Sequence, residues 1–402
     1  MKTSELRKTN ACCGCGACVT VCPKDAISLV EDKYGFIYPE IDESICVNCG
    51  ACKKVCVFST EKKNDLCICY ACVNQDNAQI MKSASGGIFA AIASEFLRTG
   101  GFVCGAATKI ENGVITVEHK VISRLNDLSE LQGSKYVQSY TLPAFREIKE
   151  LLEKGEKVLF SGTPCQVDAI KSLYEKYVGK SLFTIDIICH GVPNQKFLNG
   201  YLHEYQKRLG RQLAYIDFRN KKYGWGKTGI AKFGDTEILI TPENSSYYDL
   251  FMESEISREN CYLCPYANLN RVGDLTIGDY WGAAEFSKDL IEKNNLSEEK
   301  GISCLIVNNK NGRELLNKFS DNILLFQIDV RKATIYNTQL REPAKHTSKR
   351  ERIMDTFADK GYAPIEKVFQ RQLFIKRCKN KLKQIIPKSI KYTVKKVLKR
   401  SK

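Results

Sequence analysis

Long apolar runs are absent from this 402-residue sequence. No stretch approaches the roughly 18–20 consecutive apolar residues that a transmembrane helix needs. The first 30 residues also lack the apolar centre of a secretory signal peptide. We therefore expect a cytoplasmic protein, whose thiols stay reduced.

Histidine is scarce, with four residues, whereas cysteine is abundant, with 19. In a reducing compartment, so many cysteines favour metal or redox chemistry over disulfide bonds. The cysteines are therefore the first place to look for function.

Acidic residues are absent from the C-terminal end of the chain, where Arg371 to Lys402 contain thirteen Lys and Arg residues. Setting those thirteen charges against the net +15 leaves about +2 for residues 1–370. Because the basic charge is confined to this segment, we do not expect the protein to bind nucleic acid.

The same segment carries apolar residues at helical spacing. One helical face is expected to hold Phe374, Cys378, Leu382, Ile385 and Ile386, and after Pro387 the pattern returns at Ile390, Val394, Val397 and Leu398. Two interpretations stay open. The segment is either a solvated basic helix docked on the body, or a contact for an acidic partner or an anionic membrane at its inner face.

Two cysteine runs near the N-terminus share the spacing C-x2-C-x2-C-x3-C. In bacterial dicluster ferredoxins, the fourth cysteine of each such run binds the cluster of the other run. The spacing therefore predicts two [4Fe-4S] clusters, the first held by Cys12, Cys15, Cys18 and Cys56, and the second by Cys46, Cys49, Cys52 and Cys22. A pair of zinc sites is the alternative, although zinc does not need eight thiols in this double run.

Other cysteines near these runs fit no complete ligand set. Cys13 is out of register and is expected to pack beside a cluster. Cys67, Cys69 and Cys72 lie in an alternating segment that predicts the first strand of the next domain, with the thiols acting as small apolar side chains. A further cluster at these three residues is the less favoured alternative. Between the two runs, residues 32–42 are expected to form a short hairpin.

Residues 66–340 alternate short apolar runs with amphipathic helical patterns. Strands are predicted at 101–108, 158–163, 182–191 and 302–309, and helices at 86–100, 143–155 and 194–210. This alternation predicts an α/β domain with a mostly parallel or mixed sheet covered by helices. The fold class is therefore α+β or α/β, with a dicluster ferredoxin-like domain at 1–62, a larger α/β domain at 66–340 and a basic helical tail at 341–402.

Cys165 follows the strand 158–163 at the start of a helix, where the pKa of a thiol is expected to be lowered. Cys189 follows another strand, and Cys261 and Cys264 form a C-x2-C pair. Four thiols suffice for a third [4Fe-4S] cluster. The spacing also allows half a zinc site, or a nucleophilic Cys165 with His190 as its base.

Two small polar loops predict a site for a phosphate-bearing cofactor. "SASGGIFAAIA", residues 83–93, opens a helix whose free amides suit an anion. "GSKYVQS", residues 133–139, adds the cation Lys135, which suits a phosphate or the edge of a flavin ring. The alternative for the first loop is an ordinary helix N-terminus.

Taken together, these motifs resemble the family of coenzyme F-420 hydrogenase/dehydrogenase beta subunits, in its form with an N-terminal dicluster ferredoxin. The matching segments, in the order of that family, include "LQGSKYVQS", "VLFSGTPCQV", "DIICHGVP", "FRNKKYGW" and "CYLCPYANLNRVGDLTIGDYWG". The resemblance implies an FAD-binding flavoprotein domain that carries its own [4Fe-4S] cluster on Cys165, Cys189, Cys261 and Cys264. The FAD contacts that it implies are Ser85, Gly86, Gly87, Ser134, Lys135, Tyr136, Gly162 and Thr163.

The expected function is that of an iron–sulfur flavin-dependent oxidoreductase. It would pass electrons between ferredoxin-type clusters and FAD and so reduce or oxidise an unknown organic substrate. Candidate catalytic residues are His190, Lys135 and Asp279, each of which could equally be structural. Its redox partner would be a donor or acceptor protein or a small redox coenzyme.

Many bacterial members of the dicluster type resemble proteins encoded beside glycan-assembly enzymes, so the resemblance implies glycan or polysaccharide biosynthesis as one expected context. Two alternatives stay open, namely a non-catalytic electron-transfer subunit of a larger complex and a coenzyme F-420 reductase or dehydrogenase.

Overall fold

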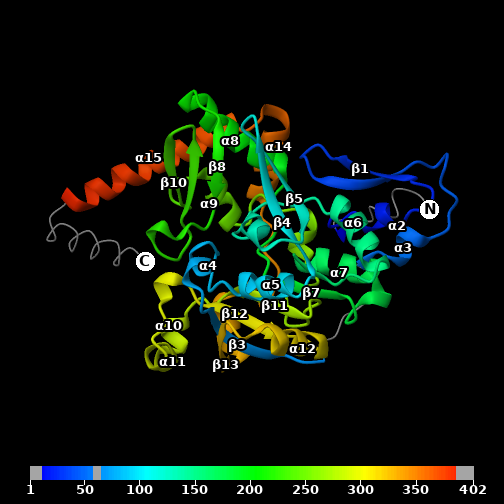
Figure 1. Cartoon of the computed structure of the whole chain (residues 1–402). Coiled ribbons are helices and arrows are strands. Elements are labelled where there is room, and N and C mark those ends of the chain that lie inside the picture. Colours follow the sequence, from blue (N-terminus) through cyan, green and yellow to red (C-terminus); the bar gives the residue numbers. More distant parts are fainter. Residues whose placement is uncertain (1–10, 58–64, 386–402) are drawn as a thin grey trace, which may run out of the picture.

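The computed structural model describes residues 11–57 and 65–385 (Figure 1). Its N-terminal unit contains α2 (Ala17–Val21), β1 (Ile27–Glu31), β2 (Ile37–Ile41) and α3 (Ala51–Lys54). β1 and β2 pair antiparallel, so the predicted hairpin is present, but its first strand begins before the predicted segment 32–42. Helix α2 contacts two helices of the larger domain, α6 (Leu142–Glu153) and α7 (Pro164–Leu173).

An eight-stranded mixed sheet forms the centre of the larger domain, in the order β13-β3-β12-β11-β7-β6-β4-β5. Its strands are β3 (Ile68–Asn74), β4 (Phe102–Glu111), β5 (Val114–Ile122), β6 (Val158–Gly162), β7 (Leu182–Ile187), β11 (Leu275–Asp279), β12 (Ser303–Val307) and β13 (Ile323–Ile328). The four central strands β4, β6, β7 and β11 are parallel, whereas the pairs at both edges are antiparallel. The predicted mixed α/β sheet is therefore confirmed.

Helices cover both faces of this sheet, because alternate side chains of a buried strand point to opposite sides. Leu159 of β6 belongs to the core beneath α5 (Ile88–Arg98) and α12 (Lys310–Phe319). Its neighbours Val158 and Phe160 pack in the core formed with α6 and α7. The remaining helices of the domain are α4 (Asn77–Met81), α8 (Gln195–Leu209), α9 (Ser246–Met252), α10 (Ala283–Phe286), α11 (Lys288–Lys293) and α13 (Val330–Tyr336). Short 3-10 helices span Leu125–Glu130, Glu175–Tyr177, Lys221–Tyr223, Glu259–Leu263, Glu298–Lys300 and Thr338–Leu340.

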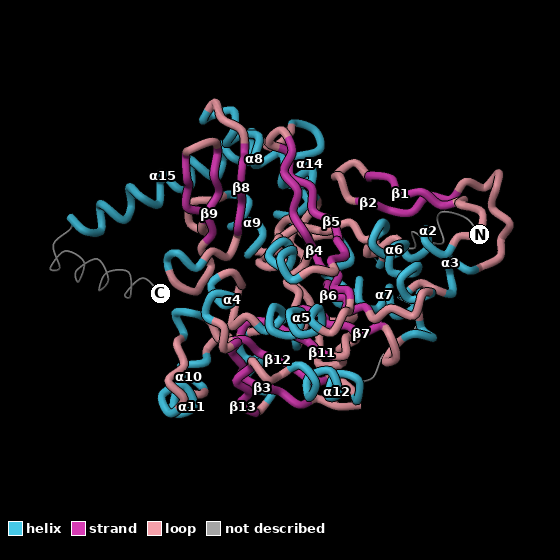
Figure 2. Tube along the Cα trace, viewed as in Figure 1, coloured by secondary structure: helices cyan, strands magenta, loops and turns pink. Residues whose placement is uncertain are grey.

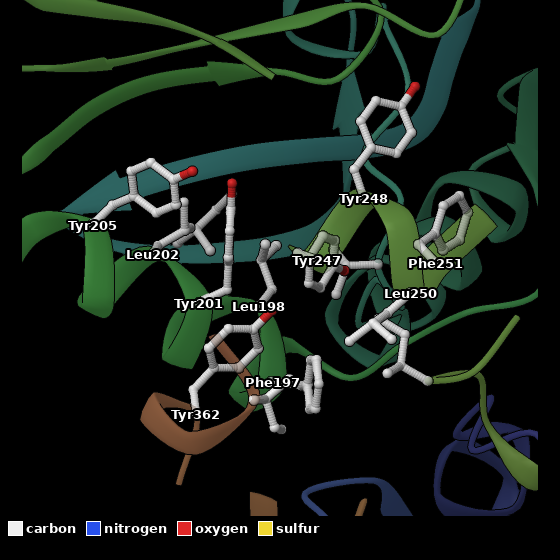
Figure 3. Packing of buried hydrophobic residues seen from close by; sticks show 14 of the residues in the cluster. Phe197, Leu198, Tyr201, Leu202, Tyr205, Tyr247, Tyr248, Leu250, Phe251 and Tyr362 are labelled. Carbon is white, nitrogen blue, oxygen red and sulfur yellow. The ribbon is translucent and has the colours of Figure 1, made fainter. Parts of the chain in front are cut away.

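A second, three-stranded antiparallel sheet of β8 (Leu213–Asp217), β9 (Gly229–Phe233) and β10 (Thr236–Ile240) lies beside the main one (Figure 2). It shares an aromatic-rich core with α8 and α9, in which Tyr201 stacks on Tyr247 with ring centroids 5.6 Å apart (Figure 3). This sheet was not among the predicted elements.

The C-terminal part of the described chain forms α14 (Ser348–Lys360) and α15 (Ala363–Ile385). Met354 and Phe357 of α14 and Ile365 of α15 are buried in the same aromatic-rich core. The first half of the predicted tail therefore packs on the body. Farther along α15, Phe374 is 67% exposed. The predicted apolar residues Ile386, Ile390, Val394, Val397 and Leu398 lie outside the described residues.

None of the helices in the described ranges combines the length and apolarity that a membrane span needs.

Candidate functional site

The first predicted cysteine set converges in the N-terminal unit. The thiols of Cys12 and Cys18 each interact electrostatically with those of Cys15 and Cys56. Burial is the main cause that raises the pKa of both the Cys12 and the Cys18 thiol. The loop closes tightly because Gly14 adopts a left-handed backbone with φ of 64°.

The second set lines a small cavity near the surface of the same unit. Cys22, Cys46, Cys49 and Cys52 all line it. Cys49 is exposed. Cys22 therefore lies with the second run and Cys56 with the first, which is the exchange that the double run predicts.

The third set gathers around a cavity of about 50 Å³ between the large sheet and the N-terminal unit. Cys165 lies in the first turn of α7, Cys189 follows β7, and the C-x2-C pair lies in and just after the 3-10 helix Glu259–Leu263. Burial raises the pKa of Cys261 to about 12 and that of Cys264 to about 11. Cys13, which fitted no register in the sequence, lines the same cavity.

The thiol of Cys165 has a lowered pKa of about 7, in the predicted direction. Its largest cause is a hydrogen bond from Cys13, and Thr163 adds a second. The amide at the helix start, which was the predicted cause, contributes less. Cys13 also forms a hydrogen bond with Cys15, so one buried thiol contacts both the first and the third set. The expected position of Cys13 beside a cluster fits its contact with Cys15, whereas no sequence pattern indicated the contact with Cys165.

A cavity of about 490 Å³ lies at the carboxyl ends of the parallel strands. Nine of the predicted cofactor and catalytic residues line it, namely Ser85, Gly87, Ser134, Lys135, Tyr136, Gly162, Thr163, His190 and Asp279. Gly86 is not among its lining residues. A Cβ at Gly86 would lie 2.7 Å from the carbonyl oxygen of Cys72 and 2.9 Å from the amide of Ser303, so this glycine is needed where the loop packs on the sheet.

Asp279 is held by a buried ion pair that the sequence analysis missed. Arg219 donates two hydrogen bonds to its carboxylate, at 2.9 and 3.0 Å, and Trp225 donates a third at 3.0 Å. Arg219 also donates to the Tyr136 hydroxyl at 3.2 Å, and its Nε has no hydrogen-bond partner. Both Arg219 and Trp225 lie in the segment "FRNKKYGW", one of the segments that match the family, and this match is what could have pointed to them.

Two histidines line the cavity. His190 has both ring nitrogens engaged, because Nε2 lies 3.0 Å from the carbonyl oxygen of Phe251 and Nδ1 lies 2.9 Å from the amide nitrogen of Gln339. Its catalytic role stays a prediction, and the contacts favour a positioning role. His119, which the sequence analysis missed, stacks on Phe160 with ring centroids 4.9 Å apart. Burial lowers its pKa to about 4, so the ring is neutral at pH 7.

Lys135 lies in a turn whose carbonyl groups surround its ammonium. Nζ donates to the carbonyl oxygens of Gln132 at 2.6 Å and Gly133 at 3.3 Å. Burial lowers its pKa to about 8. The next residue, Tyr136, is held at a φ of 44°, a left-handed conformation that is rare for a bulky side chain.

Comparison with known protein families finds a match in the larger domain and another in the N-terminal unit. Residues 155–330 match the family described as the C terminus of the coenzyme F420 hydrogenase/dehydrogenase beta subunit. Residues 11–60 match the 4Fe-4S dicluster domain. The chain therefore combines an N-terminal 4Fe-4S dicluster domain with the C-terminal domain of that family. The predicted resemblance is confirmed, and the protein is of the iron–sulfur, electron-transfer oxidoreductase type.

The individual relatives are distant in sequence. It is 23% identical to the F subunit of the F(420)H(2) dehydrogenase of Methanosarcina mazei over 310 residues, which are 73% of this chain and 83% of the relative. It is also 23% identical over 353 residues to an uncharacterized protein of Methanocaldococcus jannaschii, covering 77% and 86% of the two chains. A chain of the F420-reducing [NiFe] hydrogenase complex from Methanosarcina barkeri aligns with a TM-score of 0.47 and 16% identity, over 73% of this chain and 92% of that one.

Proposed function

We propose that this chain is an iron–sulfur flavoprotein that passes electrons between three [4Fe-4S] clusters and one FAD, and so reduces or oxidises an organic substrate. One observation carries the proposal. The 490 Å³ cavity and the cavity of the third cysteine set share a wall, to which Cys189, His190 and Thr163 contribute. A cofactor in the larger cavity would therefore lie beside the third set.

The donor sets fit clusters better than single ions. Each set supplies four thiols, and all 19 cysteines of the chain are free. A [4Fe-4S] cubane takes four thiolates, one for each iron atom, and each predicted set offers that number.

The larger cavity fits a dinucleotide flavin in size and chemistry. A volume of about 490 Å³ lies within the usual range of cofactor sites. The start of α5 and the ammonium of Lys135 suit anionic phosphates, and the unpartnered buried Nε of Arg219 leaves a donor for a bound group. FAD would supply exchange between one-electron and two-electron transfer. The chain itself holds Arg219 in place through Asp279.

The contacts of Cys13 support a route between the N-terminal unit and the cavity. The Cys13 thiol contacts Cys15 of the first set and Cys165 of the third. Because Cys22 and Cys56 are exchanged between the two runs, the first and second sets are also joined through the chain. The second set contains the exposed Cys49, which suits an encounter with an electron-donor or electron-acceptor protein.

Coenzyme F420 is the second candidate for the substrate, because one relative belongs to an F(420)H(2) dehydrogenase. Anaerobic reoxidation of the reduced protein by F420 and by other small acceptors tests this directly. Saturable turnover with one compound would establish an enzyme and its substrate. Turnover that requires a partner protein would instead establish an electron-transfer subunit. A role in glycan biosynthesis stays a prediction.

Lys135 predicts how FAD binding depends on pH. Its pKa of about 8 means that the ammonium is mostly charged at pH 7 and mostly neutral at pH 9. The Coulombic attraction between the ammonium and an FAD phosphate is lost with that charge, so the affinity of flavin-free protein for FAD should fall about tenfold between pH 7 and pH 9. Lys135→Gln should bind more weakly at pH 7 and show a flat profile in fluorescence titrations. An unchanged pH profile in that variant would contradict the role.

The basic C-terminal segment predicts attachment to an anionic membrane surface. On the described part of α15, Val368 is 58% and Phe374 67% exposed, beside the basic residues. Each Lys or Arg near such a surface contributes about 1 kcal/mol. Deleting residues 371–402 should therefore abolish sedimentation with anionic vesicles. Neither the full chain nor the truncated chain should sediment with neutral vesicles. Equal sedimentation with and without the segment would contradict this membrane role.

A further inference from the structure

Arg258 is a completely buried cation with no assigned role. Its side chain is 0% exposed. Nε donates to the carbonyl oxygen of Cys12 at 2.9 Å, Nη1 to Gln138 Oε1 at 3.1 Å, and Nη2 to the carbonyl oxygen of Ile37 at 2.6 Å. All three acceptors are neutral, so they satisfy the donors without balancing the charge.

Other buried arginines have carboxylate partners. Arg271 pairs with Asp186 at 2.6 Å and Arg350 pairs with Glu259 at 2.9 Å. Within the part of the chain that the structure describes, no salt bridge joins Arg258 to a carboxylate. Burying a charge is costly unless an opposite charge lies nearby, so the site calls for an anion that the side chains do not supply as carboxylate.

The guanidinium lies between the first and the third cysteine sets. It contacts the loop of the first set through the Cys12 carbonyl, and the backbone carbonyl of Arg258 accepts a hydrogen bond from the Cys261 amide at 2.9 Å. Its charge acts on Cys12 and Cys15 of the first set and on Cys165 and Cys261 of the third. The charges that act on Cys52 of the second set are instead those of Cys49 and Cys22.

Arg258 is also rigidly held. The Tyr38 ring lies against it, with the guanidinium carbon 4.1 Å from the ring centroid. A Cβ at Gly14 would lie 3.0 Å from Nη2, so the loop of the first set packs closely on the guanidinium. Gln138 joins Arg258 to Cys13, because its amide donates to the Cys13 carbonyl at 2.9 Å. A charge fixed in this way acts on both sets without reorganisation.

We propose that Arg258 raises the reduction potentials of the first and third clusters together. The inference rests on the proposed function, since it requires both clusters. Reduction adds one electron to an already anionic cluster, and a fixed positive charge stabilises the more negative state. One cation that acts on both clusters shifts both reduction potentials in the same direction. Arg258 is thus a positioning residue rather than a catalytic one.

A reductive titration of the full chain, followed by electron paramagnetic resonance, tests this. Dithionite or an electrode supplies the electrons. In Arg258→Gln, the reduction potentials of the first and third clusters should fall by at least about 59 mV. For a one-electron couple, this shift is a tenfold change in the ratio of reduced to oxidised cluster. The wave of the second cluster serves as an internal reference and should not move.

Two variants complete the test. Arg258→Lys keeps the positive charge, so its ratios of reduced to oxidised cluster should stay within threefold of those of the wild-type protein. The double variant Arg350→Gln with Glu259→Gln removes a neighbouring ion pair without changing the net charge and should leave all three waves unchanged. The inference fails if Arg258→Gln with full iron content keeps the wild-type potentials, or if Arg258→Lys shifts as far as Arg258→Gln. A wild-type protein without a third cluster would instead overturn the proposed function, and iron analysis shows this before any variant is made.

Discussion

Replacing Cys165 with alanine should lower the iron content from about twelve to about eight atoms per chain, since each [4Fe-4S] cluster holds four. Cys165 shares its cavity with the other three cysteines of the third set. Loss of one thiolate from a buried cubane removes the cluster, while the two N-terminal clusters keep complete ligand sets. We also expect reduction of the flavin through the N-terminal clusters to slow at least a hundredfold, whereas FAD content stays near one per chain.

Cys104→Ala is the matched control for that variant. Cys104 is fully buried in the same core as Cys165 but belongs to none of the three sets. Its iron content should stay at about twelve atoms per chain. Colorimetric iron analysis and flavin absorbance on anaerobically purified protein provide both numbers. Twelve irons in Cys165→Ala would refute the assignment of the third set.

Replacing Arg271 with methionine should produce the largest loss of stability. Its guanidinium is 1% exposed and pairs with Asp186, which is 0% exposed. It also donates to the carbonyl oxygens of Tyr266 and Ile187, at 2.6 and 3.0 Å. Removing one partner of a buried pair leaves an uncompensated charge, at a cost of about 3–5 kcal/mol. For a chain of 402 residues each kcal/mol shifts the melting temperature by about 1 °C, so it should fall by roughly 4–6 °C.

The same pair fastens the Cys261–Cys264 segment to the sheet. Arg271 follows that segment, and Asp186 lies on β7, which leads to Cys189. We therefore expect Arg271→Met to lose the third cluster more readily than the other two. The double variant Asp186→Asn with Arg271→Met removes the stranded charge and should recover part of the melting temperature. A single variant as stable as wild type in differential scanning calorimetry would exclude this bracing role.

The sequence predicts a site best where the chemistry of that site depends on residues that are close together along the chain. The double cysteine run predicts the exchange of Cys22 and Cys56, because a cubane needs ligands from a tightly curled loop. Period-two and period-3.6 apolar patterns placed β6, α5 and α8 within a few residues of their observed bounds.

Contacts between distant segments escaped sequence analysis. The pKa of Cys165 falls in the predicted direction, but mainly through Cys13, which is 152 positions away and reaches it only in the folded chain. The Arg219–Asp279 pair and the three-stranded sheet of β8 to β10 likewise depend on tertiary packing. The burial of Met354 and Phe357 in the first half of the tail likewise depends on the aromatic-rich core that α8 and α9 supply.

We propose that the third cysteine set joins the ferredoxin-type clusters to a flavin in the 490 Å³ cavity. An anaerobic reductive titration of the wild-type protein counts the electrons taken up while the absorbance is followed. We expect about five electron equivalents per chain, one for each of three clusters and two for FAD, with bleaching of the flavin band. An endpoint at two or three equivalents, with no flavin band to bleach, would refute this arrangement.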